Sequence, residues 1–194
     1  MYFYRIARII VSIIFRIIFR IEINGKENIP MEGPLIVCSN HISNLDPIIL
    51  GIAFNRPIIF MAKKELFNSR FIAKIMTGLG AFPVDRKGSD IAAIKTSFRV
   101  LKNEQVLGIF PEGTRVHEMD LDNVKPGIGL ISIKNKSPVI PVFIESNYKL
   151  FSKVVVNIGE PILFDEYHGQ KLETQDYWEV SKEIMKSIYS LKNS

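Results

Sequence analysis

The chain has 194 residues, of which 47% are hydrophobic, and its mean hydropathy is +0.14. This length fits one domain with a sizeable core, and the hydropathy is too low for a protein that crosses the membrane several times. The formal charge of +5 points to an anionic partner, while the single cysteine, Cys38, excludes a disulfide framework and a Cys/His metal site.

The first 21 residues form an apolar segment that is interrupted only at Arg5, Arg8, Ser12, Arg16 and Arg20. At about 100° per residue these positions fall in one arc of about 120°, which predicts a basic amphipathic helix. A membrane-spanning helix is disfavoured, since each arginine near the bilayer centre costs about 2.5–3.5 kcal/mol. A cleaved signal peptide is disfavoured because no small-residue cleavage site follows. We expect residues 1–21 to lie in a membrane surface; the alternative is an ordinary helix packed on the core.

Residues 22–194 contain no repeat or linker and are predicted to form one domain. Apolar runs typical of β-strands lie at residues 20–24, 35–39, 57–62, 81–84, 106–110, 139–144 and 153–158. Helical patterns lie at residues 48–54, 68–79, 89–101 (with Ser89-Asp90 as cap), 127–136 and 174–191. This alternation predicts an α/β fold with a mixed, largely parallel central sheet flanked by helices. In such sheets, functional residues gather at the carboxyl ends of the strands.

The run from Asn40 to Pro47 places His41 five residues ahead of Asp46, directly after the buried strand 35–39. The Asp-Pro pair is typical of a helix start with Asp46 as N-cap. A strand-to-helix turn can fold the carboxylate back onto the imidazole, and such an imidazole is a general base for an alcohol. The alternative is that Asp46 only caps the helix and His41 is a loop histidine.

Four blocks together carry a family resemblance: NHxxxxD at 40–46, a glycine-to-arginine segment at 80–86, FPEGTR at 110–115 and VIPV at 139–142. In this order and spacing the chain resembles the lysophosphatidate acyltransferase family of glycerolipid acyltransferases, which acylate 1-acylglycerol 3-phosphate. One departure is Val116, which stands where the family usually has a serine after FPEGTR. Residues 22–194 would then be a glycerolipid acyltransferase domain.

The resemblance implies that His41 is the catalytic base for the sn-2 hydroxyl and that Asp46 orients it. It also implies an acceptor site, for which the candidate residues are Lys63, Arg86, Glu112, Gly113, Thr114 and Arg115. Guanidinium groups suit a phosphate dianion, so Arg86 and Arg115 are expected to bind it. Glu112 is expected to hold a glycerol hydroxyl, with a tight structural turn as the alternative for its block. Lys63 is equally well interpreted as a solvated lysine.

Several residues are left outside the expected site. His117 and His168 lie in polar stretches and are expected to be solvated, and Cys38 is expected to be a buried thiol rather than a nucleophile. The hydroxyl would attack the acyl thioester directly, without a covalent enzyme intermediate. The oxyanion donors stay open, with the backbone of 112–114 as one option. The helix 68–79 either borders an acyl channel or packs in the core.

No nucleotide-binding loop or metal-ligand cluster occurs, so no cofactor is expected, and acyl-CoA or acyl carrier protein would be the acyl donor. Expected partners are lysophosphatidate and the cytoplasmic face of the cell membrane, bound in a peripheral or monotopic way, and no nucleic acid. Three alternatives remain: an acyltransferase acting on glycerol 3-phosphate or another lysophospholipid, a thioesterase, and a non-catalytic lipid-binding protein.

Overall fold

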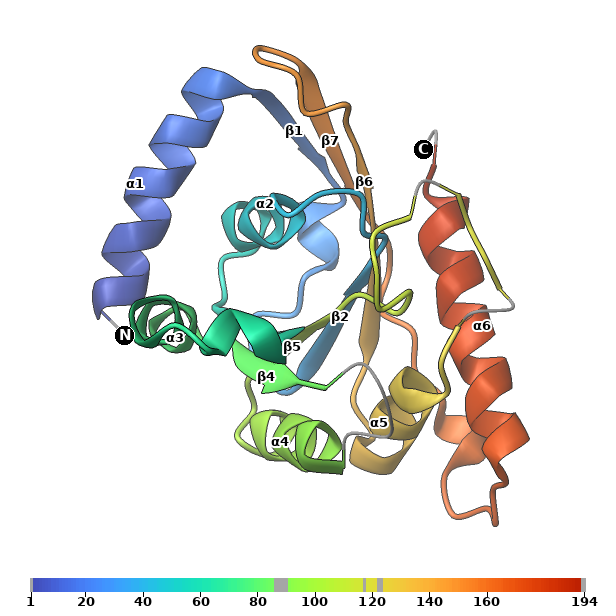
Figure 1. Ribbon diagram of the computed structural model, residues 1–194. Helices are drawn as coiled ribbons and strands as arrows, with labels where there is room; N and C mark the ends of the chain where they lie inside the picture. Colours follow the sequence, from blue (N-terminus) through green and yellow to red (C-terminus); the bar gives the residue numbers. More distant parts are fainter. Residues whose placement is uncertain (1, 86–90, 117, 122–123, 193–194) are drawn as a thin grey trace.

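The computed structural model describes residues 2–85, 91–116, 118–121 and 124–192, which form one α/β domain around a seven-stranded sheet (Figure 1). The strands are β1 Arg20–Asn24, β2 Leu35–Ser39, β3 Ile58–Lys63, β4 Phe82–Val84, β5 Val106–Ile109, β6 Val139–Glu145 and β7 Lys153–Ile158. Their order in the sheet is β1-β7-β6-β2-β5-β3-β4, and all neighbours are parallel except β6 and β7. The predicted largely parallel sheet is confirmed, with every strand within one residue of its expected bounds.

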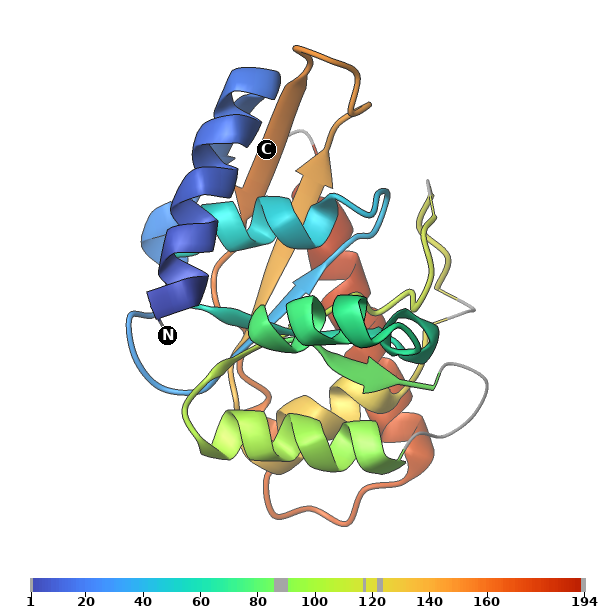
Figure 2. The same cartoon turned by 60° about the vertical axis from the view of Figure 1, so that its left-hand side comes forward.

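Helices cover both faces of this sheet (Figures 1 and 2). They are α1 Tyr2–Ile18, α2 Asp46–Ala53, α3 Arg70–Gly78, α4 Ile91–Lys102, α5 Gly127–Asn135 and α6 Thr174–Ser190. Three short 3₁₀ turns complete the described elements: η1 Lys26–Asn28, η2 Lys64–Phe67 and η3 Asp165–Tyr167. One core layer lies between the sheet and α1 and α2, and the other between the sheet and α4, α5 and α6. The proposed Ser89-Asp90 cap lies outside the described residues.

The strand sequences explain this layering. All five residues of β2 are buried, as expected for a central parallel strand that is covered on both faces. Among the helices that cover the sheet, α6 buries Val180, Ile184 and Ile188, which recur every four residues along one face. The alternation of buried strands with one-sided helices is therefore what fixes the order of layers.

Helix α1 is shorter than the predicted segment 1–21. It ends at Ile18, the next residue Phe19 is buried in the core, and Arg20 pairs with Lys153 as the first residue of β1. The helical prediction is therefore wrong for residues 19–21 and the overlapping strand prediction for residues 20–24 is confirmed, because pairing with β7 sets this backbone in an extended form. Arg8 donates a hydrogen bond of 2.6 Å to the Phe54 carbonyl at the end of α2.

The outer face of α1 is apolar and exposed. The exposed isoleucines are Ile9, Ile10, Ile13, Ile14 and Ile17, whereas Phe15 and Ile18 pack against the core. Helix α1 thus packs on the core through one face, as the alternative expects, and leaves a second apolar face exposed. Among the residues that the structure describes, no helix has the length and apolar character needed to span a bilayer.

Helix α3 has a similar exposed face. The structure describes every residue of α3, and none of these residues is buried. Phe71 is 75% exposed, and Ile72 and Ile75 are also open to solvent. The core-packing interpretation of 68–79 is therefore wrong.

Candidate active site

The carboxyl ends of β2, β3, β5 and β6 meet at one edge of the sheet, because these strands are parallel. The segments that directly follow them bring His41, Glu112 and Tyr148 to this edge, where Lys63 is the last residue of β3. Strand β4 also ends there, at Val84, but Arg86 lies outside the described residues. The NHxxxxD and FPEGTR blocks therefore share this edge, where functional residues were expected to gather.

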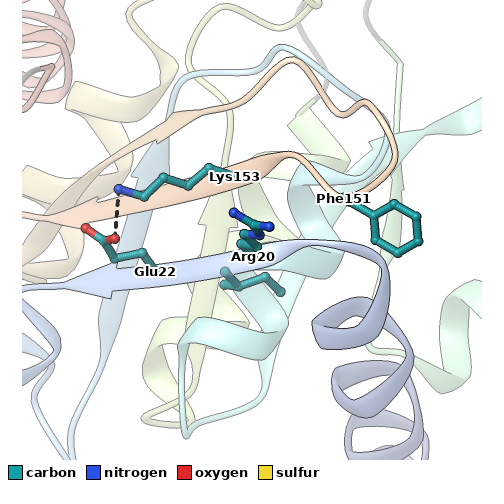
Figure 3. Close-up of a pocket in the computed structure, with 5 residues that line it drawn as sticks. Arg20, Glu22, Phe151 and Lys153 are labelled. Carbon is teal, nitrogen blue, oxygen red and sulfur yellow. Dashed lines mark ion pairs between the residues drawn. The ribbon is translucent and has the colours of Figure 1, made fainter.

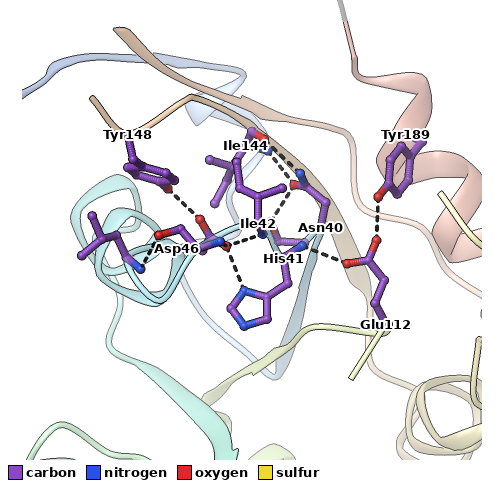
Figure 4. A network of polar contacts seen from close by, with 11 residues as sticks. Asn40, His41, Ile42, Asp46, Glu112, Ile144, Tyr148 and Tyr189 are labelled. Atoms are coloured by element: carbon purple, nitrogen blue, oxygen red, sulfur yellow. Dashed lines mark hydrogen bonds and ion pairs between the residues drawn. The ribbon is translucent and has the colours of Figure 1, made fainter. Parts of the chain in front are cut away.

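His41 and Asp46 form a buried pair (Figure 4). The distance between His41 Nδ1 and Asp46 Oδ2 is 2.8 Å, and the Asp46 side chain is fully buried. The same Oδ2 accepts hydrogen bonds of 2.7 Å from the backbone N–H groups of Ile42 and Ser43. The turn between β2 and α2 is thus wrapped around the carboxylate, which explains how five residues of spacing bring the two groups together.

Asp46 is not the N-cap of α2. It is the first residue of the helix, Leu45 precedes it as the cap residue, and the Asp46 carboxylate turns back to residues 41–43 rather than to the helix backbone. The capping prediction is wrong in this respect because the imidazole and the turn compete for the carboxylate. The position at the N-terminus of α2 still favours its negative charge through the helix dipole.

This arrangement sets the tautomer of His41. Asp46 Oδ2 acts only as an acceptor, so His41 Nδ1 carries the hydrogen and Nε2 keeps a free lone pair. The imidazole also stacks on the Phe110 ring, with ring centroids 4.1 Å apart and an interplanar angle of 21°. The ring is therefore held at one edge and on one face, with Nε2 available as a general base.

Asn40 lies at the point where the chain leaves the sheet, just before His41. Its side chain donates to the Ile144 carbonyl at 2.9 Å and accepts from the Ile144 N–H at 2.7 Å. The amide thereby continues the β2–β6 ladder after the backbone of β2 has turned away. As a result, the His41 backbone N–H is free to bind elsewhere.

That N–H binds Glu112, whose carboxylate is held entirely by protein donors in Figure 4. Glu112 Oε2 accepts from the His41 N–H at 3.0 Å, and Oε1 accepts from the Tyr189 hydroxyl of α6 at 2.6 Å. Burial raises the pKa of Glu112 above its usual value, while the bonds from Tyr189 and His41 oppose that rise. Glu112 thus joins the turn after β5 to His41 and to α6.

The rest of the 110–115 block passes close to His41. Gly113 has φ = +67°, which explains the glycine, and an added Cβ there would meet nothing within 4 Å. The Val116 N–H donates to the His41 carbonyl at 2.9 Å. This bond places the exposed Thr114 and Arg115 next to the dyad, on the side open to solvent.

The other expected residues are less constrained. Lys63 ends β3 at the same edge and lies 3.7 Å from the Glu65 carboxylate, with both side chains about half exposed. His168 is partly exposed, and its Nδ1 lies 3.3 Å from Asp165 Oδ1, whereas His117 lies outside the described residues. Cys38 is fully buried, and burial raises the pKa of its thiol, so it is unsuited to act as a nucleophile.

Two residues of the network were missed by sequence reasoning. Tyr189 lies in the amphipathic pattern of α6, and Tyr148 follows β6, the strand that contains the VIPV block. Neither has a local signal that marks it as part of the site. Tyr148 donates a 2.6 Å hydrogen bond to Asp46 Oδ1, so the carboxylate is bound through both oxygens. Burial next to Asp46 raises the pKa of Tyr148, which keeps its hydroxyl a donor.

A separate shallow hollow of about 380 Å³ lies at the β1–β7 edge of the sheet (Figure 3). It is lined by Arg20, Ile21, Glu22, Phe151 and Lys153. It contains none of the residues of the dyad.

Within the described ranges, no group of three or more His, Cys, Asp or Glu side chains has an arrangement that could hold a metal ion.

Comparison with known proteins decides the family. A family model described as "Acyltransferase" matches residues 20–145, which include the dyad and the 110–115 block. The chain belongs to this acyltransferase family. The resemblance inferred from the four motifs is thereby confirmed, and so is the expected class of enzyme, an O-acyltransferase. Helix α1, Tyr148 and Tyr189 lie outside the matched range.

Individual relatives agree with this family. A 1-acyl-sn-glycerol-3-phosphate acyltransferase of Bacillus subtilis is 35% identical over 148 residues, which cover 73% of each chain. One of Borreliella burgdorferi is 31% identical over 143 residues, which cover 72% of this chain and 57% of the relative. The crystal structure of the 1-acyl-sn-glycerophosphate acyltransferase PlsC of Thermotoga maritima superposes with a TM-score of 0.67 at 26% identity, covering 90% of this chain and 73% of that one.

Proposed function

We propose that this acyltransferase is a 1-acyl-sn-glycerol-3-phosphate acyltransferase, which transfers a fatty acyl group from a thioester to the sn-2 hydroxyl of lysophosphatidate and makes phosphatidate. The observation that carries the proposal is the His41–Asp46 pair, with Nδ1 bound to the carboxylate and Nε2 free to act as a base. The names of the relatives support the choice of acceptor.

The proposed reaction needs no covalent enzyme intermediate. His41 Nε2 takes the proton of the sn-2 hydroxyl while the hydroxyl oxygen attacks the thioester carbonyl carbon. Asp46 stabilises the imidazolium that forms. When the tetrahedral intermediate collapses, the C–S bond breaks and the imidazolium returns the proton to the leaving thiolate. The products are phosphatidate and a free thiol, and Cys38 takes no part.

The acceptor phosphate is expected to bind Arg115 and Arg86, with Thr114, Gly113 and Lys63 as further candidates. The support for Arg115 is its place one residue before the Val116–His41 backbone bond. A guanidinium there can fix the phosphate near the base, so that the sn-2 hydroxyl faces Nε2. In this proposal Glu112 shapes the site through His41 and Tyr189.

The membrane part of the proposal rests on α1. Its exposed isoleucines form an apolar face, and the exposed Arg16 lies in the same helix of a chain with a formal charge of +5. Such a helix suits the surface of an anionic bilayer, where it would bring the site to its lipid acceptor. The enzyme would then be peripheral, on the cytoplasmic face. The donor would be acyl-CoA or acyl carrier protein, with no metal or nucleotide cofactor.

A product analysis tests the proposal. The purified protein is incubated with labelled acyl-CoA or acyl carrier protein and with lysophosphatidate, glycerol 3-phosphate or other lysophospholipids, and products are identified by mass spectrometry. We expect labelled phosphatidate. Free fatty acid as the only product would instead indicate a thioesterase and contradict the proposal.

The base is tested by His41→Ala, which should lower kcat by about 10²–10⁴, the usual contribution of a general base. His168→Ala is the matched control. This histidine also pairs with an aspartate, but it lies just after η3, in the connection to α6, and has no role in the proposed reaction. Activity of His41→Ala within a few-fold of the control would remove His41 from the mechanism.

A further inference from the structure

Tyr148 joins the catalytic carboxylate to a loop at the molecular surface. Its hydroxyl donates to Asp46 Oδ1, the oxygen that does not bind His41, at 2.6 Å (Figure 4). The residue belongs to the connection between β6 and β7, residues 146–152. Within the described residues, no other side chain donates a hydrogen bond to Oδ1, so Tyr148 sets how that oxygen is held.

The backbone of this connection is held in an unusual form. Tyr148 has φ = +50° and Phe151 has φ = +62°, and both are bulky residues that rarely adopt the left-handed region. Side chains within the connection support the form: the Tyr148 N–H binds Ser146 Oγ and the Lys149 N–H binds Asn147 Oδ1, both at 3.0 Å. Such strain persists where surrounding contacts determine it.

Those contacts come from the junction of α1 and β1. The Phe151 N–H donates to the Ile18 carbonyl at 2.8 Å, and the Arg20 N–H donates to the Ser152 carbonyl at 3.0 Å. Between these two bonds, the ring of Phe19 meets the ring of Tyr148 edge-on, with centroids 5.8 Å apart. The end of α1 and the residue that binds Asp46 are therefore one packed unit.

The tip of the connection is apolar and exposed. Leu150 is 68% exposed and Phe151 is 61% exposed, next to Ile17 at the end of α1, which is 69% exposed. Figure 3 shows Phe151 beside the end of α1, with its ring pointing away from β1 and β7. The exposed Lys149 and Arg20 flank this tip, as positive charges that complement an anionic lipid surface.

We propose that Tyr148 is a positioning residue for the His41–Asp46 pair, and that it couples this pair to the bilayer because its loop contacts lipid through Leu150 and Phe151. This inference rests on the proposed acyl transfer at a membrane surface. Lipid contact holds the loop in its strained form, which keeps the Tyr148 hydroxyl on Oδ1 and Oδ2 on His41 Nδ1. Loss of the loop's order releases Oδ1 and loosens the orientation of the imidazole.

Removing the Tyr148 donor takes away the side-chain partner of Asp46 Oδ1, so the carboxylate holds His41 Nδ1 less firmly in one orientation. Tyr148→Phe keeps the ring against Phe19 and removes only this donor.

The test uses the full chain, a soluble short-chain lysophosphatidate and acyl-CoA, with and without anionic phospholipid vesicles. For Tyr148→Phe we expect kcat to fall about 10- to 150-fold, the effect of losing a hydrogen bond to a charged group, with KM little changed. Vesicles should stimulate kcat of the wild type more than that of the variant. Tyr167→Phe, a partly buried tyrosine of η3, is the matched control.

A second variant tests the loop itself. Leu150→Gln combined with Phe151→Asn removes the apolar tip, and asparagine tolerates the positive φ of position 151. We expect wild-type kcat without vesicles and a loss of the stimulation by vesicles. If the wild type makes no phosphatidate, the proposed function itself fails. If the wild type is active, unchanged kcat in Tyr148→Phe, or unchanged stimulation in the loop variant, would overturn this inference.

Discussion

At the scale of single residues, two buried carboxylates divide the work of holding His41. Asp46 binds the imidazole and the backbone N–H groups of the two residues after His41. Glu112 binds the backbone N–H of His41 itself. One carboxylate therefore orients the ring, while the other fixes the main chain from which the ring projects. This division explains why the 110–115 turn must lie beside the dyad even where it does not touch the acceptor.

The role of Glu112 gives a prediction for Glu112→Gln. The amide can accept from the His41 N–H and donate to the Tyr189 hydroxyl, so both contacts survive. Because a neutral hydrogen bond is worth about 1 kcal/mol, kcat/KM should fall less than about tenfold. Burial raises the pKa of Glu112 in the folded state, so the wild type loses stability as pH rises above the unfolded pKa of about 4.3. The variant lacks this loss.

Urea unfolding between pH 4 and pH 8 measures the second part. The free energy of unfolding of Glu112→Gln, relative to the wild type, should increase with pH across this range. Tyr189→Phe serves as the companion variant, since it removes the other partner of the same carboxylate. A large rise in KM for lysophosphatidate, with no change in the pH dependence of stability, would place Glu112 on the acceptor instead.

Sequence reasoning reaches some of these residues and not others, for a physical reason. His41, Asp46, Glu112 and Arg115 lie in short blocks whose residue types state their chemistry. Tyr148 and Tyr189 act through contacts that span 102 and 77 residues of sequence, and only the fold brings them to the site. The N-cap assignment of Asp46 failed because local capping propensity competes with a tertiary partner.

At the scale of elements, the contact between α5 and α6 fixes where Tyr189 stands. Gly129 of α5 lies directly under α6: a Cβ there would come within 2.2 Å of the Tyr177 carbonyl oxygen. The Gly129 N–H also donates to Ser181 Oγ at 3.1 Å. The close approach of the two helices therefore depends on a residue without a side chain.

Gly129→Ala should consequently destabilise the protein by about 1–3 kcal/mol, the usual cost of overpacking. Gly127→Ala is the matched control in the same helix, because a Cβ there meets nothing within 4 Å; it should be neutral or stabilising by up to about 1 kcal/mol. Urea unfolding of both variants measures the difference. Equal stability of the two would show that α6 can move away from α5 without cost.

The positions of the helices and strands along the chain were easier to predict than which of their apolar faces are buried and which are exposed. Buried apolar runs identify the strands because parallel strands are covered on both faces. The apolar faces of α1 and α3 predict helices equally well, but periodicity does not say whether such a face meets a core or remains exposed, as Phe71 does. The end of α1 was misplaced for a related reason, since the β1–β7 pairing of Arg20 is a long-range contact.

At the scale of the whole molecule, the sheet separates two surfaces. Helix α1 lies on one face of the sheet together with α2, and α4 lies on the opposite face (Figures 1 and 2). Both helices expose isoleucine: Ile13 and Ile17 on α1, and Ile91 on α4. The first surface also carries the exposed tip of the β6–β7 loop beside the end of α1. If the enzyme binds a membrane as proposed, we expect this side to meet the bilayer.

The double variant Ile13→Gln/Ile17→Gln tests this orientation. Both side chains are more than half exposed, so the fold should keep its stability. Because burying one isoleucine side chain is worth about 1.5–3 kcal/mol, the partition coefficient onto anionic vesicles should fall by at least about tenfold. Flotation with phospholipid vesicles measures it, and raising the salt concentration should weaken the binding of the wild type, since Arg16 and the net charge contribute. The control Ile91→Gln should float like the wild type; equal flotation of all three proteins would exclude α1 as the membrane contact.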